Sequence, residues 1–153
     1  MTIRLARLDD IDSMVELGRR IHALSRYAPM AFNTQRVTEA LHDIVARGAP
    51  KYVLLVATDS AERVVGGLLG VVERALFTDA LSASIMHYLV LPEARMGGHA
   101  PRLLRAFERW AANRGVADIN FGINSGIDAE RVGRYARRMG SRAVGEHLVK
   151  DMK

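Results

Sequence analysis

The part of this sequence that most restricts its fold covers residues 85–111, where an apolar strand meets an amphipathic helix through a short loop. Residues 85–91 are apolar and rich in strand-forming side chains, which predicts a buried strand that ends at Pro92. Beyond the loop, apolar residues recur at helical spacing. Gly97 and Gly98 lie between the two elements. Because glycines allow close backbone approach and the first helical turn has unpaired amides, this layout predicts a cradle for phosphate.

The loop is neither a Walker loop nor a dinucleotide fingerprint, because no Gly-Lys-Ser/Thr follows it and G-x-G-x-x-G is absent. The pattern Arg95-x-x-Gly98-x-Ala100 instead resembles the coenzyme A pyrophosphate loop of the GNAT acetyltransferase superfamily. Residues 91–111 look most like those of its small phage-associated members. The resemblance implies that the pyrophosphate is bound by the loop residues Arg95, Met96, Gly97, Gly98 and Ala100.

The remaining chain shows no linker or internal repeat, so we expect one α/β domain over residues 1–153 with a mixed sheet flanked by helices. Apolar patterns predict strands at residues 2–7, 51–58, 64–74, 82–91, 117–123 and 143–150. They predict helices at residues 9–24, 34–48, 100–114 and 128–139. The resulting order, β-α-α-β-β-β-α-β-α-β, is also that of the GNAT fold, so the resemblance covers the whole chain.

Glycines interrupt the strand predicted at residues 64–74. Gly66, Gly67 and Gly70 in the strand at 64–74 predict a bulge or a close backbone approach.

In the GNAT fold, the strands matching 82–91 and 117–123 run parallel and splay apart, which leaves a V-shaped cleft for the thioester-bearing arm of acetyl-CoA. By this resemblance, the backbone that pairs with the arm belongs to Leu89, Val90 and Leu91.

Asn124 follows the predicted strand at 117–123 and has two interpretations. It faces the cofactor from across the cleft, or it serves a turn beside Ser125 and Gly126.

Acetyl transfer requires a neutral attacking amine and a stabilised leaving thiolate. Residues 134–140 are similar to the Leu-Tyr-x-x-x-Gly segment of the superfamily. This implies that Tyr135 stands beside the thioester sulfur as a general acid, the alternative being a core aromatic. Ser141 departs from the family, which usually has an aromatic residue after that glycine.

The general base is less defined, because the strand at 82–91 lacks the glutamate that many relatives carry there. His87 is one candidate, since the ordinary pKa of histidine is about 6.5. The alternative interpretation of His87 is a structural histidine that is hydrogen-bonded within the sheet. Glu73 on the neighbouring strand is a second candidate, acting through a water, and its alternative is a surface carboxylate. Solvent acting on an already neutral amine is the third possibility.

Composition limits the other functional classes. The net charge of +5 comes from 22 basic residues, of which only three are lysines. Arginines recur along one side of the helices predicted at 100–114 and 128–139. These side chains form solvated helix faces, or they contact an outer phosphate of the cofactor or an acidic partner. Nucleic-acid binding remains an alternative, although the interleaved aromatic residues that would support it are missing.

The cysteine and histidine content limits the possible metal sites, and one histidine lies in the glycine loop. With no cysteine, the chain excludes disulfides and thiolate metal sites, and its histidines lack ligand spacing, so we predict no metal. His99, in the glycine loop, is expected to be solvent-exposed or to flank phosphate.

The resemblance to the GNAT superfamily implies an acetyl-CoA-dependent N-acetyltransferase in which a primary amine of a small molecule or protein attacks directly in a ternary complex. No apolar run of membrane-spanning length or secretory leader is found, so we expect a cytoplasmic location. Tyr27, Phe32 and Phe77 are candidate acceptor walls or core residues. The alternatives are an idle acyl-CoA-binding regulatory domain, a basic nucleic-acid-binding protein, and an enzyme for a longer acyl-CoA or an oxygen acceptor. The resemblance also makes a homodimer an expectation.

Overall fold

The computed structural model describes residues 1–48 and 50–152. The helices and strands follow in the order β1 (Thr2–Leu5), α1 (Ile11–Leu24), α2 (Thr34–Arg47), β2 (Tyr52–Thr58), β3 (Val64–Arg74), β4 (Leu81–Val90), α3 (His99–Ala112), β5 (Asp118–Phe121) and α4 (Ala129–Arg138). Within the described residues, the strands form one five-stranded sheet in the order β1-β2-β3-β4-β5. Neighbouring strands are antiparallel except β4 and β5, which are parallel. The predicted mixed α/β architecture is therefore confirmed.

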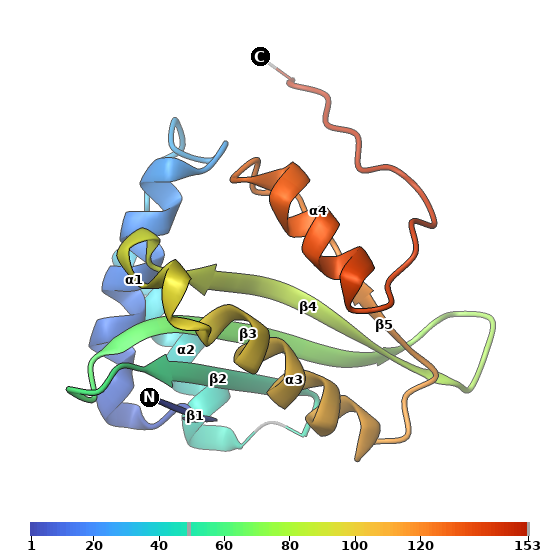
Figure 1. Ribbon diagram of the computed structural model, residues 1–153, viewed down its shortest axis with the longest axis horizontal. Helices are drawn as coiled ribbons and strands as arrows, with labels where there is room; N and C mark the ends of the chain where they lie inside the picture. Colours follow the sequence, from blue (N-terminus) through green and yellow to red (C-terminus); the bar gives the residue numbers. More distant parts are fainter. Residues whose placement is uncertain (49, 153) are drawn as a thin grey trace.

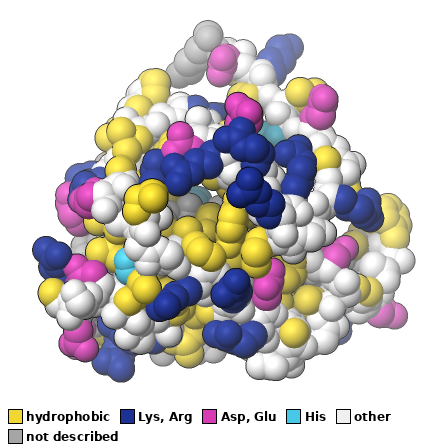
Figure 2. Space-filling model, viewed as in Figure 1, with side chains coloured by type: hydrophobic (Ala, Val, Ile, Leu, Met, Phe, Trp, Pro, Cys, Tyr) yellow, Lys and Arg dark blue, Asp and Glu magenta, His cyan; other side chains and the backbone are white. Residues whose placement is uncertain are grey.

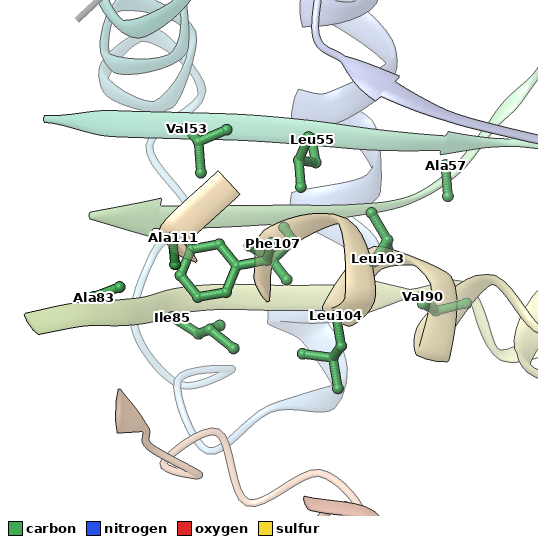
Figure 3. Close-up of a cluster of buried hydrophobic side chains, with 11 residues drawn as sticks. Val53, Leu55, Ala57, Ala83, Ile85, Val90, Leu103, Leu104, Phe107 and Ala111 are labelled. Atoms are coloured by element: carbon green, nitrogen blue, oxygen red, sulfur yellow. The ribbon is translucent and has the colours of Figure 1, made fainter. Parts of the chain in front are cut away.

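Helices cover both faces of the sheet, with α1 and α2 on one side and α3 on the other (Figure 1). Successive β2 residues point to opposite faces, so Val53 and Leu55 pack under α3 whereas Leu54 packs under α1. Figure 3 shows Phe107 of α3 lying over the sheet between these strand side chains. Its side chain is completely buried, and so is that of Leu103 one turn earlier. Burial on both faces explains why β2 is a continuous apolar run.

The glycines of β3 are required by close packing on both faces of the sheet. A Cβ atom on Gly67 would lie 2.5 Å from Cε of Met14 on α1. A Cβ atom on Gly70 would overlap the ring of Phe107 on the opposite face. The pairing of β3 with β4 also shifts register between Leu69 and Gly70. Of the two alternatives predicted at these glycines, the close approach is confirmed, whereas the extra residue of this register shift lies in β4.

Several predicted boundaries differ from the structure. Helix α3 begins at His99, one residue before the predicted Ala100, after Gly98 turns the chain with a left-handed φ of 72°. The strand predicted at 143–150 is wrong, because residues 141–152 form no helix or strand. Strand propensity needs a partner and a face to bury. The neighbouring edge strand, β5, is only four residues long and largely exposed, so it offers little of either.

We predict that Gly70→Ala destabilises the fold. The added methyl group would meet the fully buried ring of Phe107, and overpacking of this kind costs about 1–3 kcal/mol. Urea unfolding measures the change in the free energy of unfolding. Gly145→Ala is the matched control, since nothing lies within 4 Å of a Cβ atom there. Equal unfolding midpoints for Gly70→Ala and the wild type would contradict this packing.

Candidate active site

A cleft opens where β4 and β5 separate. The two strands pair over four residues only, ending with Ile85 opposite Phe121. Strand β4 continues to Val90 with β3 as its only strand partner in the described chain. Its other edge therefore presents backbone groups to a cleft of about 450 Å³. The remaining walls come from the segment after β5, helix α4, the loop before α3, and Ile21 of α1.

Most residues predicted for the site line this cleft. They are Tyr135, His87, Leu89, Val90, Arg95, Met96, Gly98, Ala100 and Asn124. Leu91 is not among the lining residues and packs instead with the core cluster on the α1 side. Gly97 is also absent from the lining, because its backbone faces the imidazole of His99.

The structure does not bring Glu73 to the cleft. It lies near the end of β3, opposite Ser82 at the start of β4, and its carboxylate forms a 2.8 Å ion pair with Lys51. A strand residue can adjoin β4 and still be remote from the cleft, because the cleft opens only beyond Ile85. The surface-carboxylate interpretation of Glu73 is the one that fits.

The three candidate acceptor walls also lie outside the lining of the cleft. Phe77 is 94% exposed in the β3–β4 connection, and the ring of Phe32 packs edge-on against His22. Tyr27 stacks beneath the guanidinium of Arg26, 4.2 Å from its ring centre.

Arg26 joins the α1–α2 loop to the segment that follows β5. Its Nε donates a 2.6 Å hydrogen bond to the carbonyl oxygen of Asn124, and its backbone N–H donates one of 2.9 Å to the carbonyl of Ser125. These contacts hold one wall of the cleft against α1. Because they join positions about a hundred residues apart through backbone carbonyls, no sequence motif reports them.

The glycine loop places positive charge beside the cleft. Residues 92–97 form a 3₁₀ turn, and Gly98 then leads into the amino-terminal turn of α3. Arg95 from this loop forms a 2.7 Å ion pair with Asp128, which precedes α4. Arg131 also lines the cleft, and it forms no ion pair with the residues that the structure describes. Figure 2 shows basic side chains gathered around a hollow on this face.

His99 is buried, contrary to the expectation that it is exposed. Only 5% of its surface is accessible, and its Nδ1 has no hydrogen-bond partner among the described residues. A Cβ atom on Gly97 would lie 2.7 Å from its Nε2, so Gly97 is required to accommodate this ring. Burial lowers the pKa of His99. The loop therefore packs inward through its histidine while Arg95 and Gly98 face the cleft.

His87 and Tyr88 are neighbours in β4, and a one-residue bulge before them decides which face of the strand each side chain occupies. Leu69 pairs with His87 and the next residue of β3 pairs with Ile85, so Met86 is the extra residue within this pairing. His87 thus shares the face of Leu69, which packs on the α1 side. Tyr88 packs with the core cluster on the α3 side. His87 lines the cleft and is exposed to solvent, and partial desolvation lowers the pKa of its imidazole.

Two tyrosines line the cleft, Tyr88 from β4 and Tyr135 from α4. The hydroxyl groups of Tyr88 and Tyr135 are both buried, and neither has a hydrogen-bond partner in the described chain. Burial raises the pKa of both phenols, so both are neutral hydrogen-bond donors at neutral pH. Sequence analysis singled out Tyr135 but gave no role to Tyr88. The bulge that turns Tyr88 toward α4 leaves no mark on the apolar pattern of β4.

The family is decided by comparison with known proteins. A family model described as acetyltransferase (GNAT) family matches residues 19–140. The chain belongs to the GNAT acetyltransferase family. No curated protein matches it in sequence.

Solved GNAT-like structures share the fold over nearly the whole chain. A transcriptional regulator from Bacillus halodurans C-125 is 23% identical, with a TM-score of 0.77 and 99% of each chain covered. The aminoglycoside 6'-N-acetyltransferase AAC(6')-IG from Acinetobacter haemolyticus is 17% identical, with a TM-score of 0.74 and coverage of 100% of this chain and 99% of that one. AAC(6')-Iy, solved with the bisubstrate analogue CoA-S-monomethyl-acetylneamine, is 14% identical, with a TM-score of 0.78 and coverage of 99% and 97%.

Membership of the GNAT family assigns acetyl transfer from acetyl-CoA to this chain in general terms. Its cleft suits that donor, because a free strand edge, a cationic loop and buried hydroxyl groups meet there. The described residues contain no cluster of three or more His, Asp or Glu side chains placed to share a metal ion. None of their helices is long and apolar enough to span a membrane.

We predict that burial of His99 makes the fold less stable in acid. The pKa of His99 is lowered in the folded state, so the unfolded chain binds more protons below the ordinary histidine pKa of about 6.5. The free energy of unfolding therefore falls as pH drops below that value. Urea unfolding at several pH values should show a shallower dependence for His99→Gln. His87→Gln is the companion variant, because the lowered pKa of His87 acts in the same direction. An unchanged slope in His99→Gln would contradict a buried neutral His99.

Proposed function

We propose that this GNAT protein transfers the acetyl group of acetyl-CoA to a primary amine, by direct attack within a ternary complex. The observation that carries the proposal is Tyr135, which lines the β4–β5 cleft and whose buried hydroxyl has no hydrogen-bond partner among the described residues. A buried donor without a partner is costly to the fold, so a ligand group that accepts its hydrogen bond would remove that cost.

The donor would bind along β4 with its phosphates at the glycine loop. The free edge of β4 near Leu89 and Val90 offers backbone groups for the amides of the pantetheine arm. Arg95 and Arg131 supply positive charge for the pyrophosphate, beside the amino-terminal turn of α3. When coenzyme A binds, Arg95 would exchange the carboxylate of Asp128 for phosphate oxygens. The guanidinium would therefore have an anionic partner both in the free protein and in the complex.

The proposed chemistry uses His87 and Tyr135 on opposite sides of the thioester. The amine nitrogen forms a bond to the carbonyl carbon and loses a proton to the neutral imidazole of His87, directly or through water. The carbon–sulfur bond then breaks, and the sulfur takes a proton from the Tyr135 hydroxyl. Return of the proton from His87 to the phenolate, through solvent, restores both side chains and leaves an amide and free coenzyme A.

An amine acceptor is supported by the neighbouring structures, since one is named as an aminoglycoside antibiotic 6'-N-acetyltransferase and another was solved with the bisubstrate analogue CoA-S-monomethyl-acetylneamine. A small molecule and a protein amine are both retained as acceptors, because no residue of the α1–α2 loop lines the cleft and none of the lining residues is diagnostic of one acceptor. The absence of cysteine is compatible with a reducing compartment, which supports a cytoplasmic location.

The donor site is tested by titration calorimetry with coenzyme A, using Gly98→Glu and Gly98→Gln as a matched pair. Both variants share the backbone strain of a side chain at φ 72°, and nothing lies within 4 Å of the new Cβ. Only the first places a negative charge where the pyrophosphate is proposed. We expect Gly98→Glu to bind about 5- to 1,000-fold more weakly than Gly98→Gln, since a like charge at contact distance costs about 1–4 kcal/mol.

Asp128→Asn should change affinity in the opposite direction. It frees Arg95 and removes a negative charge beside the cleft, so coenzyme A should bind about two- to fivefold more tightly, the scale of an exposed ion pair. Equal affinities for the two Gly98 variants would show that the pyrophosphate lies elsewhere. If the wild type bound neither coenzyme A nor acetyl-CoA, the proposed function would be wrong.

The pH dependence of turnover tests His87 as the base. Because desolvation lowers its pKa and the neutral imidazole accepts the proton, kcat measured with both substrates saturating should fall along an acidic limb centred below about 6.5. His87→Gln should remove that limb and lower the plateau at least about 100-fold. The assay follows free coenzyme A with an amine identified by an acceptor screen. A His87→Gln variant that kept both the limb and the plateau would assign the base to solvent.

A further inference from the structure

Tyr88 stands at the point where the two strands of the cleft part. Its ring packs edge-on against Phe121, with 5.6 Å between ring centres and 74° between the planes. Phe121 is the last residue of β5 paired with β4. The bulge at Met86 sets the orientation, because the extra residue places Tyr88 on the same face as Ile85, three positions earlier. In a regular strand, residues three apart point to opposite faces.

The Tyr88 hydroxyl has no role in holding the fold together. It is buried, and no described residue hydrogen-bonds to it. The same is true of the Tyr135 hydroxyl, which reaches the cleft from α4. Both tyrosines line one cleft and pack against the same core cluster. Two neutral donors for which the described residues supply no partner therefore belong to one cleft, and this is costly unless a ligand accepts from both.

We propose that the Tyr88 hydroxyl is a further catalytic group, which donates a hydrogen bond to the carbonyl oxygen of the bound acetyl thioester. This inference rests on the proposed function. As the amine attacks, the electron pair of the carbonyl π bond moves to this oxygen. Tyr88 stabilises the resulting oxyanion through its hydrogen bond and keeps its own proton. When the carbon–sulfur bond breaks, the pair returns to the carbonyl and Tyr135 protonates the sulfur.

This division assigns one phenol to each atom on which charge develops. Tyr88 belongs to the strand whose free edge, at Leu89 and Val90, is proposed to hold the arm, so its hydroxyl is placed at the acyl end of that arm. His87 faces the α1 side of the same strand, where the amine would arrive. The adjacent residues His87 and Tyr88 would thus act on opposite sides of the carbonyl carbon.

Isotope-edited infrared spectroscopy tests the proposal without an acceptor. The carbonyl stretch of protein-bound acetyl-CoA is obtained as the difference between samples with ¹²C and ¹³C at the thioester carbonyl. A hydrogen bond to the oxygen polarises the bond, so we expect the wild-type stretch at lower frequency than that of free acetyl-CoA. Tyr88→Phe should return the stretch toward the free value, whereas Tyr135→Phe should leave it low. Tyr52→Phe, which removes a phenol outside the cleft, is the control.

The outcomes separate this inference from the proposed function. Binding of acetyl-CoA with the same stretch in wild type and Tyr88→Phe would overturn the role of Tyr88 and leave the donor site standing. A stretch that moved in Tyr135→Phe instead would also overturn it, by assigning the oxygen to the other phenol. No binding of acetyl-CoA to the wild type would overturn both.

Kinetics and stability provide a second readout. With an accepted amine, Tyr88→Phe should lower kcat about 100-fold and leave KM for acetyl-CoA within about twofold, as expected for a group that acts in the transition state. Its free energy of unfolding should not fall, because the variant keeps the ring on Phe121 and loses a hydroxyl that bonds to no described residue. Loss of stability with kcat unchanged would instead assign Tyr88 a structural role.

Discussion

The early end of β5 is the constraint on which the site depends. Pairing between β4 and β5 stops at Ile85 and Phe121, yet β4 continues for five residues with its other edge held by β3. An unpaired strand edge inside a protein carries hydrogen-bonding groups that require partners. Here the edge is enclosed by α4 and by the segment that Arg26 ties to the α1–α2 loop. It therefore suits the extended, amide-bearing arm of acetyl-CoA that we propose it binds.

The sheet beneath the cleft must be rigid if this edge is to stay open. Glycines of β3 let Met14 approach from one face and Phe107 from the other, which fixes the strand that supports β4. On that support, the extra residue at Met86 decides what the cleft contains. A β4 strand without the bulge would place Tyr88 on the α1 face and move its hydroxyl away from Tyr135. One inserted residue thus assembles the two phenols.

The sequence predicted the central elements because each had a local cause. Gly48 ends α2 in a left-handed conformation, Asn33 caps its start through the N–H of Arg36, and β3 has its predicted bounds. Predictions that depended on a distant partner were less successful. Strand 143–150 did not form, Glu73 lies at the wrong end of its strand, and His99 is buried. Tyr88 was missed because alternation reports which residues are apolar but not where a bulge reverses the faces.

Charge is distributed along the cleft in a way that accounts for the missing carboxylate on β4. Arg95, Arg131 and Asp128 lie at the loop and α4 end, whereas the groups proposed to surround the acyl carbon are two phenols and an imidazole. A glutamate among buried, unpaired phenols would be costly to keep ionised. A histidine whose pKa desolvation has lowered is neutral before reaction and becomes a cation as the oxyanion forms. The proton transfer would then create a charge of each sign together, beside donors already in position, so an uncharged cavity suits a histidine base better than a carboxylate.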